Sequence, residues 1–200
     1  MSRQARLILL GLIILISIVY NLSEIAFERP YEDSKEKDTK ELADRLNSPI
    51  EEPKIEYHPR PAEGFSPYDK YFGKGIYDKN SLNSFIIENS NSSDAVVLLV
   101  NAFTKRKVRN EFIRKGGTFE MTSVPNGTYY LEWTSGEDWS PNIDLGKVVG
   151  GFQTNRSNTK TKGMDDWMKV TGREQWTVTL FTTQGGDVES ENLDDDEFGT

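Results

Sequence analysis

The chain carries two different patterns of hydrophobic residues. Residues 7–20 form an uncharged apolar run near the N-terminus, and apolar residues continue unevenly as far as Phe27. From about Ser84 the pattern changes to short segments in which apolar and polar residues alternate, separated by turn-forming residues. A long apolar run is typical of a membrane-spanning helix, whereas alternation with period two is typical of β-strands with one buried face. The two patterns therefore predict one transmembrane helix followed by a β-sheet domain.

The apolar run is just long enough to span a bilayer. Residues 7–23 contain no charge, and about 17 to 25 helical residues cross the hydrocarbon layer. Arg3 and Arg6 precede the run, as in a secretory signal. We expect an uncleaved signal anchor over residues 1–27, which contacts membrane lipid through residues 7–27. A cleaved signal peptide and a core helix are the alternatives, but no small-residue cleavage site follows the run, and the run has no polar face.

Strands are predicted over several short segments after the anchor. Residues 95–103 are apolar on both faces and predict a central strand covered on both sides. In the segment 107–113, alternation places Val108 and Phe112 on one face and Arg109 on the other. The segment 135–174 is predicted to be rich in loops, with aromatic packing points. The remaining predicted strands are residues 84–89, 118–122, 128–134 and 175–183.

Short strands separated by turns indicate an all-β fold, an antiparallel β-sandwich of about seven strands preceded by one transmembrane helix. Charge and proline content set the boundaries. The predicted segments are the anchor (1–27), a charged, proline-containing tether (28–63), the β-sandwich domain (64–186) and an acidic disordered tail (187–200). The alternative for the tail is docking on a basic hairpin of the domain.

Composition excludes several classes of function. The chain has 200 residues, no Cys, one His and a net charge of −8. Without Cys there is no disulfide scaffold, iron–sulfur site or thiol nucleophile, and one His nearly excludes a multi-histidine metal site. The segment 64–186 carries a net charge of only +2, which disfavours nucleic acid as a partner. We therefore expect no cofactor and no metal.

Groups for catalysis are also sparse. The single imidazole, His58, lies in the predicted tether, whereas a catalytic triad needs a rigidly held His. The remaining candidates are the adjacent acids Glu137 and Asp138, and Asp165 and Asp166. Adjacent acids in polar loops are usually solvated, so we expect no catalytic residue, and a carboxylate-dependent hydrolase is the least favoured function.

A basic hairpin is the most distinctive polar feature. Residues 105–115 hold six bases and one acid. This pattern predicts a platform for phosphate or carboxylate groups of a lipid, a glycan or an acidic partner. The alternatives are that the bases only decorate two exposed turns and discourage edge pairing, or that the acidic tail binds them. The candidate binding residues are Lys105, Arg106, Lys107, Arg109, Arg114 and Lys115.

An aromatic residue in a polar loop is the second candidate. Trp139 lies within the segment SGEDWSPN. A tryptophan in such a loop either caps the end of a sandwich or offers a stacking surface to a sugar or a peptide, because loops at the ends of sandwiches often hold binding sites.

Two resemblances add to this picture. Residues 119–131, FEMTSVPNGTYYL, resemble a segment of carboxypeptidase-regulatory-like and Cna-B-like domains, which implies a prealbumin-like sandwich. The segments SPYDKYFGKGIYD (66–78), VRNEFIRKG (108–116) and PNGTYY (125–130) together resemble a domain that recurs in uncharacterised membrane-anchored proteins of the Bacteroidota. The second resemblance spans most of residues 65–183. It implies a Gram-negative source and carries no activity with it.

The expected function is that of a membrane-anchored envelope protein with a non-catalytic binding or structural module. Its partner would be an envelope protein, a glycan or an anionic molecule. We expect a single-pass protein of the inner membrane with its C-terminal domain in the periplasm. Bases on both sides of the span leave the orientation open, so a cytoplasm-facing accessory subunit of a membrane complex is the alternative. The sequence does not indicate an oligomeric state.

Overall fold

The computed structural model describes residues 39–40, 42, 54–181 and 189–200. The chain divides into two units, residues 1–53 and residues 54–200. In the first unit the described residues are helical. The predicted anchor lies outside the described residues, and among those that are described no helix is long and apolar enough to cross a membrane.

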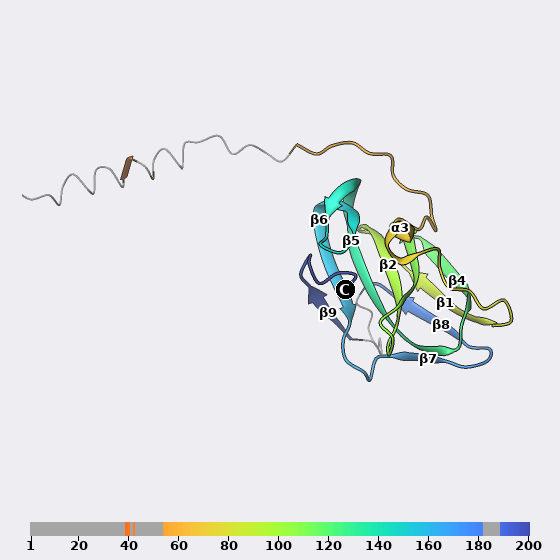
Figure 1. Ribbon diagram of the computed structural model, residues 1–200. Helices are drawn as coiled ribbons and strands as arrows, with labels where there is room; N and C mark the ends of the chain where they lie inside the picture. Colours follow the sequence, from red (N-terminus) through yellow and green to blue (C-terminus); the bar gives the residue numbers. More distant parts are fainter. Residues whose placement is uncertain (1–38, 41, 43–53, 182–188) are drawn as a thin grey trace, which may run out of the picture. The chain divides into compact units, whose positions relative to one another are not determined.

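The second unit is built almost entirely of β-strands (Figure 1). One short helix, α3 (Asp69–Phe72), precedes them. The strands are β1 (Asn83–Glu88), β2 (Asp94–Asn101), β3 (Lys107–Ile113), β4 (Thr118–Val124), β5 (Gly127–Asp144), β6 (Val149–Thr161), β7 (Met168–Val170), β8 (Gln175–Thr179) and β9 (Ser190–Leu193).

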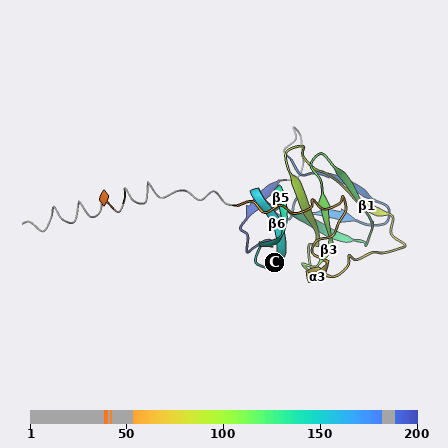
Figure 2. The same cartoon turned by 90° about the horizontal axis from the view of Figure 1, so that it is seen from above.

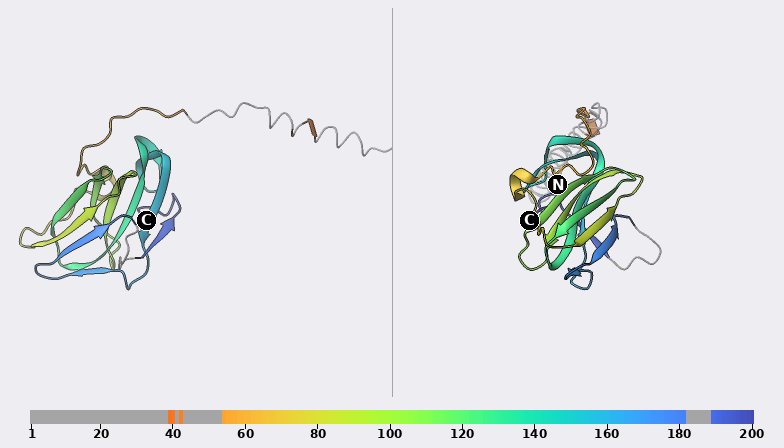
Figure 3. Two further views of the ribbon diagram at one scale, coloured as in Figure 1. Left: turned by 180° about the vertical axis from the view of Figure 1, so that it is seen from behind. Right: turned by 90° about the vertical axis from the view of Figure 1, so that its right-hand side faces the viewer.

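These strands form two sheets. The smaller sheet has the order β4–β1–β8, and the larger has the order β3–β2–β5–β6–β9, with β7 paired to β5. In Figure 3, β1, β4 and β8 lie together on one side and the β5–β6 hairpin lies on the other. The prediction of an all-β sandwich is confirmed at this level. The described residues form nine strands rather than about seven, and β1 runs parallel to β8, because the chain returns to β1 only after passing through the larger sheet.

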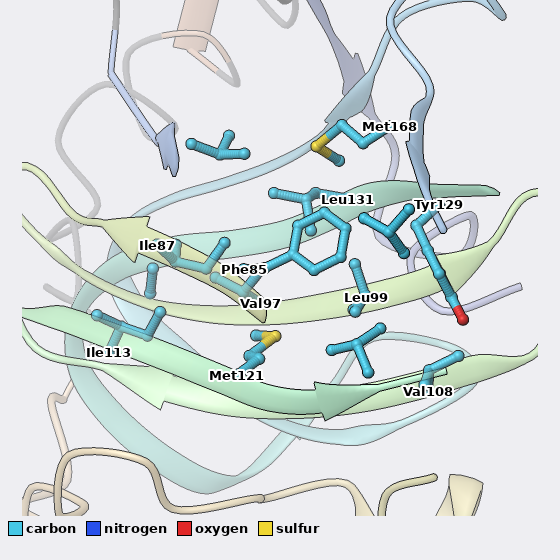
Figure 4. Packing of buried hydrophobic residues seen from close by; sticks show 14 residues of the cluster. Phe85, Ile87, Val97, Leu99, Val108, Ile113, Met121, Tyr129, Leu131 and Met168 are labelled. Atoms are coloured by element: carbon cyan, nitrogen blue, oxygen red, sulfur yellow. The ribbon is translucent and has the colours of Figure 1, made fainter. Parts of the chain in front are cut away.

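The facing surfaces of the two sheets enclose an inner core (Figure 4). Alternation along each strand sends every second side chain into this core. Its fully or almost fully buried members include Phe85, Ile87, Leu99, Met121 and Leu131.

The opposite face of the larger sheet is covered as well. Three segments contribute: the α3 region, the far half of the β5–β6 hairpin and the C-terminal residues. Figure 2 shows α3 and the C-terminus on the same side of this sheet. We call the result the outer cluster, and its buried members include Tyr68, Val96, Leu98, Phe112, Trp139, Phe152 and Phe198. This cover explains why β2 is buried on both faces, as the sequence predicts.

Strand β3 contains a β-bulge. Lys107 and Arg109 pair with adjacent residues of β2, so Val108 is the extra residue. Val108 therefore packs in the inner core, whereas Phe112 packs in the outer cluster. The prediction that these two side chains share a face is wrong, because the bulge reverses the alternation between them.

The segment 135–174 holds more strand than predicted. β5 continues to Asp144, β6 follows it as a hairpin partner, and β7 lies in the same segment. The β5–β6 register shifts between Ser135 and Glu137, and at Gly136, between them, an added Cβ atom would lie 2.5 Å from Cβ of Phe152. The prediction of a loop-rich region is wrong, because polar side chains on the exposed side of the hairpin hide its alternation.

The described part of the predicted tail is folded. β9 pairs with β6, and Phe198 is fully buried in the outer cluster. The prediction of a solvated, disordered tail is therefore wrong for residues 189–200, because burial of one aromatic side chain and pairing of one strand hold this acidic segment in place.

Part of the predicted tether also contacts the sandwich. The Arg60 guanidinium binds both carboxylate oxygens of Asp94. The Arg114 guanidinium donates two hydrogen bonds to the carbonyl oxygen of Pro61, at 3.1 and 2.9 Å. The folded unit thus begins before Gly64, the first residue of the predicted domain.

Candidate functional site

The structure does not bring the six bases of residues 105–115 together. Lys105, Arg106 and Lys107 lie before or at the start of β3, and Arg114 and Lys115 follow its end. Because a strand rises about 3.4 Å per residue, the two groups are about 20 Å apart. They therefore form two separate basic sites rather than one platform.

Arg109, between these groups, is a structural residue. Its guanidinium donates hydrogen bonds to the carbonyl oxygens of Ile76, Val108 and Thr122. The guanidinium carbon lies 3.4 Å from the centroid of the Tyr77 ring. Burial lowers the pKa of Arg109. Because its donors are used within the protein, Arg109 is not available to an external anion.

Lys107 forms a buried ion pair with Glu132. Its Nζ lies 4.0 Å from Oε1 of Glu132, and the two side chains are only 5% and 4% exposed. Glu132 accepts hydrogen bonds from the Tyr130 hydroxyl and from the backbone N–H of Gly199, both at 3.1 Å. Lys107 also donates to the backbone oxygen of Thr200. The C-terminal residues therefore complete the surroundings of this pair.

Burial opposes both charges of the pair. It lowers the pKa of Lys107 and raises the pKa of Glu132. The attraction between the two charges opposes each shift. Groups with shifted pKa values are common at functional sites, although structural ion pairs show such shifts too.

A cleft of about 300 Å³ lies beside this ion pair. Two lysines and two glutamates share its wall, so the cleft is strongly polar and its charge alone does not select an anionic ligand. The C-terminal residues form part of the same wall. The lining residues are Lys105, Tyr130, Glu132, Lys160, Leu193, Glu197 and Thr200.

Aromatic side chains extend the cleft outward. The Trp167 ring stacks on the Tyr130 ring, with centroids 6.2 Å apart and an angle of 23°. Phe103 meets Trp167 edge-on at 6.0 Å. The Nζ atom of Lys105 lies 4.9 Å from the Tyr130 centroid and 5.3 Å from the Trp167 centroid, within the range of cation–π attraction. We call these four residues the aromatic rim.

The rim exposes large apolar side chains to solvent. Phe103 is 76% exposed, and Met164, in the same β6–β7 loop as Trp167, is 74% exposed. A loop that carries exposed aromatic groups next to cations is suited to binding a partner. Together the aromatic rim and the cleft are the candidate functional site.

The predicted stacking residue Trp139 instead packs inside the protein. It is 8% exposed, and its ring meets Phe112 and Phe152 edge-on, with centroids 5.5 Å apart in each case. It caps the outer cluster, which was the alternative interpretation. Its remaining exposed edge lines a groove of about 410 Å³ together with residues that include His58 and Lys115.

Two of the four acids considered for catalysis, Glu137 and Asp138, are bound to neighbouring polar groups on the hairpin. Asp138 accepts a hydrogen bond from Thr154 and Glu137 accepts one from Asn155, each at 3.0 Å. Both acids are exposed. Within residues 54–181 and 189–200, no three His, Asp or Glu side chains are placed to hold a metal ion.

The segments 66–78 and 108–116, which carry the second resemblance, contact each other. Asn110 accepts a hydrogen bond from the backbone N–H of Tyr68 at 2.7 Å and donates one to Asp69 at 3.0 Å. Ser66 donates to Glu111 at 3.0 Å. Burial raises the pKa of Glu111 to about 7, against the hydrogen bond from Ser66. These contacts hold the α3 region against the outer edge of β3.

Sequence reasoning identified Lys105 and Lys107 but missed the residues around them. Alternation in the segment 128–134 puts Tyr130 and Glu132 on the face opposite Tyr129 and Leu131, but it does not indicate that the outer cluster and the C-terminal residues cover that face. The β2 sequence does indicate that such cover exists, because a strand that is apolar on both faces requires cover on both faces of the sheet, including over its neighbouring strands.

Comparison of the chain with protein-family models, curated proteins and solved structures finds no match. The candidate site therefore stands on its own geometry.

Proposed function

We propose that the chain is a membrane-anchored envelope protein whose β-sandwich is a non-catalytic binding module, and that its ligand contacts the aromatic rim. The observation that carries this proposal is the exposure of Phe103 beside the Trp167–Tyr130 stack and Lys105. Burying these groups against a partner removes apolar surface from water and retains the cation–π contacts.

The position of the rim supports the same proposal. Residues 54–60 reach the sandwich at the start of β2, where Arg60 binds Asp94. Phe103 lies just beyond the other end of β2. Because β2 has eight residues, its two ends are about 24 Å apart. A tether that attaches at one end leaves the aromatic rim open to a partner.

The finer parts of the proposal come from the sequence alone. They are the anchor over residues 1–27, a location in the inner membrane of a Gram-negative bacterium of the Bacteroidota type, a periplasmic domain and a prealbumin-like arrangement of the sandwich. The absence of Cys from the chain makes the topology directly testable. A single cysteine introduced as Lys79→Cys should react with a membrane-impermeant maleimide in intact spheroplasts. Labelling only after lysis would place the domain in the cytoplasm.

Site-specific cross-linking tests the binding surface. A photoreactive phenylalanine analogue at position 103 of the full chain should give a discrete adduct in cells after irradiation. The matched control is the same analogue at Phe181, which is 44% exposed and follows β8. If position 103 gives no adduct, or the same adducts as position 181, the aromatic rim is not the binding surface.

A further inference from the structure

The C-terminal residues are bound to the sandwich in the way that a peptide ligand binds a sheet edge. β9 adds to β6 as an antiparallel edge strand, with Thr159 opposite Asn192 and Thr161 opposite Ser190. Peptides that extend a sheet bind in this manner, with the backbone supplying affinity and side-chain pockets supplying specificity. We call residues 189–200 the C-terminal segment.

One side chain anchors this segment. Phe198 is fully buried in the outer cluster, and its ring meets that of Tyr68 edge-on at 6.0 Å. Beside it, the backbone N–H of Gly199 donates to Glu132 at 3.1 Å, and Lys107 donates to the oxygen of Thr200. A phenylalanine pocket and two charged backbone-binding groups therefore lie beside the part of β6 that pairs with β9, since Glu132 is the β5 partner of Lys160.

Bases along β6 match the acids of the segment. Lys160 pairs with Glu191 at 3.0 Å, and Lys162 pairs with Glu189 at 2.9 Å. Arg156 pairs with Asp195. These pairs are exposed in large part, so each contributes little alone and salt weakens it. The three ion pairs therefore favour an acidic strand at this edge but contribute only part of the binding free energy.

The fit between the segment and its site is incomplete. Thr134 and Asn158 are paired neighbours on β5 and β6, both are buried, and Asn158 also pairs with Leu193 of the segment. Among the described residues, neither Oγ1 of Thr134 nor Oδ1 of Asn158 has a hydrogen-bond partner. Buried polar atoms left unpaired cost free energy. An occupant that supplied a donor here would bind more tightly than the chain's own segment.

We propose that the β6 edge, together with the Phe198 pocket and the Lys107–Glu132 pair, is a peptide-binding site. Its ligand is an acidic extended peptide with a phenylalanine after the strand, supplied by a partner polypeptide. The C-terminal segment occupies this site as an intramolecular ligand that the partner displaces. This inference goes beyond the function proposed for the aromatic rim. The two sites adjoin at Tyr130, whose hydroxyl donates to Glu132, but the peptide titration below and cross-linking at position 103 test them separately.

Cutting the chain before the C-terminal segment tests the proposal. A seven-residue protease recognition sequence replaces residues 182–188 in the full chain, and the cut protein is titrated with a fluorescent synthetic peptide of residues 189–200. We expect saturable binding at one peptide per chain. A peptide with Phe198→Ala should bind at least about tenfold more weakly. The uncut protein should bind at least about tenfold more weakly as well, because the tethered segment competes at high effective concentration.

Matched protein variants address the charge contribution. Arg156→Ser should weaken peptide binding several-fold at low salt and less at high salt, because it removes the pair with Asp195. Arg173→Ser removes an exposed base that lies away from β6 and should leave binding unchanged.

Three outcomes would overturn the proposal. The cut fragment could stay bound and fail to exchange with excess labelled peptide. Its release could abolish the β-sheet signal in circular dichroism, which would make it an integral strand. The Phe198→Ala peptide could bind as well as the native peptide, which would show that the pocket does not read the phenylalanine.

Discussion

Several ionisable side chains of this protein are buried, and their burial has testable effects on the free energy of unfolding. Glu111 is the clearest example. It is buried at the seam between β3 and the α3 region, where it accepts a hydrogen bond from Ser66 and lies near Arg109 and Asp69. Burial raises the pKa of Glu111 to about 7, so the folded protein binds a proton at this position that the unfolded chain has released.

Stability should therefore fall as pH rises from about 4.5 to 7. In this window the folded state holds more protons than the unfolded state, and linkage makes the free energy of unfolding decrease with pH. Glu111→Gln keeps the acceptor for Ser66 and removes the titration. At pH 8 the variant should be more stable than the native protein by about 1 to 3 kcal/mol, with little difference at pH 4. Urea unfolding at both pH values measures this, with the exposed Glu120→Gln as control. Equal pH profiles for native and variant protein would refute the account.

Arg109 tests a different role for charge at the same strand. Its planar guanidinium joins three carbonyl oxygens, one in β3, one in β4 and one at Ile76, and lysine cannot reproduce that geometry. We expect Arg109→Lys to lower the free energy of unfolding by about 2 to 4 kcal/mol. Arg106→Lys, at an exposed position, should change it by less than about 0.5 kcal/mol. If the two variants unfold at the same urea concentration, Arg109 is not the structural residue that its contacts indicate.

At the scale of elements, strand β2 shows which features of the fold the sequence predicts and which it does not. The double burial of β2 is visible in the run AVVLLV, and it requires cover on both faces of the sheet. The sequence does not indicate what provides the second cover. Tyr68, Trp139 and Phe198 do so, and each lies in a polar segment far from β2 along the chain. Their contacts with β2 arise from long-range packing, which the local alternation of apolar and polar residues does not indicate.

The sequence does not indicate the full candidate site for the same reason. It identifies Lys105 and Lys107 as members of a basic cluster, but nothing local distinguishes the buried Glu132 from a glutamate on a solvent-exposed strand face. The bulge at Val108 adds a second limit, since one extra residue reverses every later side chain of β3. Period-two alternation therefore predicts the presence of strands better than it predicts the direction of individual side chains.

The α3 region gives a prediction at this scale. It contributes Tyr68 to the outer cluster, and Asn110 holds it through Tyr68 and Asp69. Asn110→Ala should raise the rate of amide hydrogen exchange over residues 66–73 by at least about tenfold and destabilise the protein by about 1 to 3 kcal/mol. The exposed Asn142→Ala serves as control. Unchanged exchange in this region would show that packing of Tyr68 alone holds α3.

For the whole molecule, the chain divides into residues 1–53, which include the proposed anchor, and residues 54–200, which form the sandwich. The inner core and the outer cluster lie entirely within residues 54–200, so removal of residues 1–27 should leave the melting temperature of the sandwich unchanged within about 2 °C. The same deletion should move the protein from the membrane pellet to the supernatant, because we propose that the apolar run is the membrane anchor. The full chain should resist extraction by alkaline carbonate. A chain that carries Leu9→Lys and Ile14→Lys should behave like the deletion, since two charges within the span make insertion costly.

If the full chain is extracted by carbonate, or if its mature form begins near residue 25, the anchor does not exist. If the deletion instead lowers the melting temperature, residues 1–27 belong to the fold.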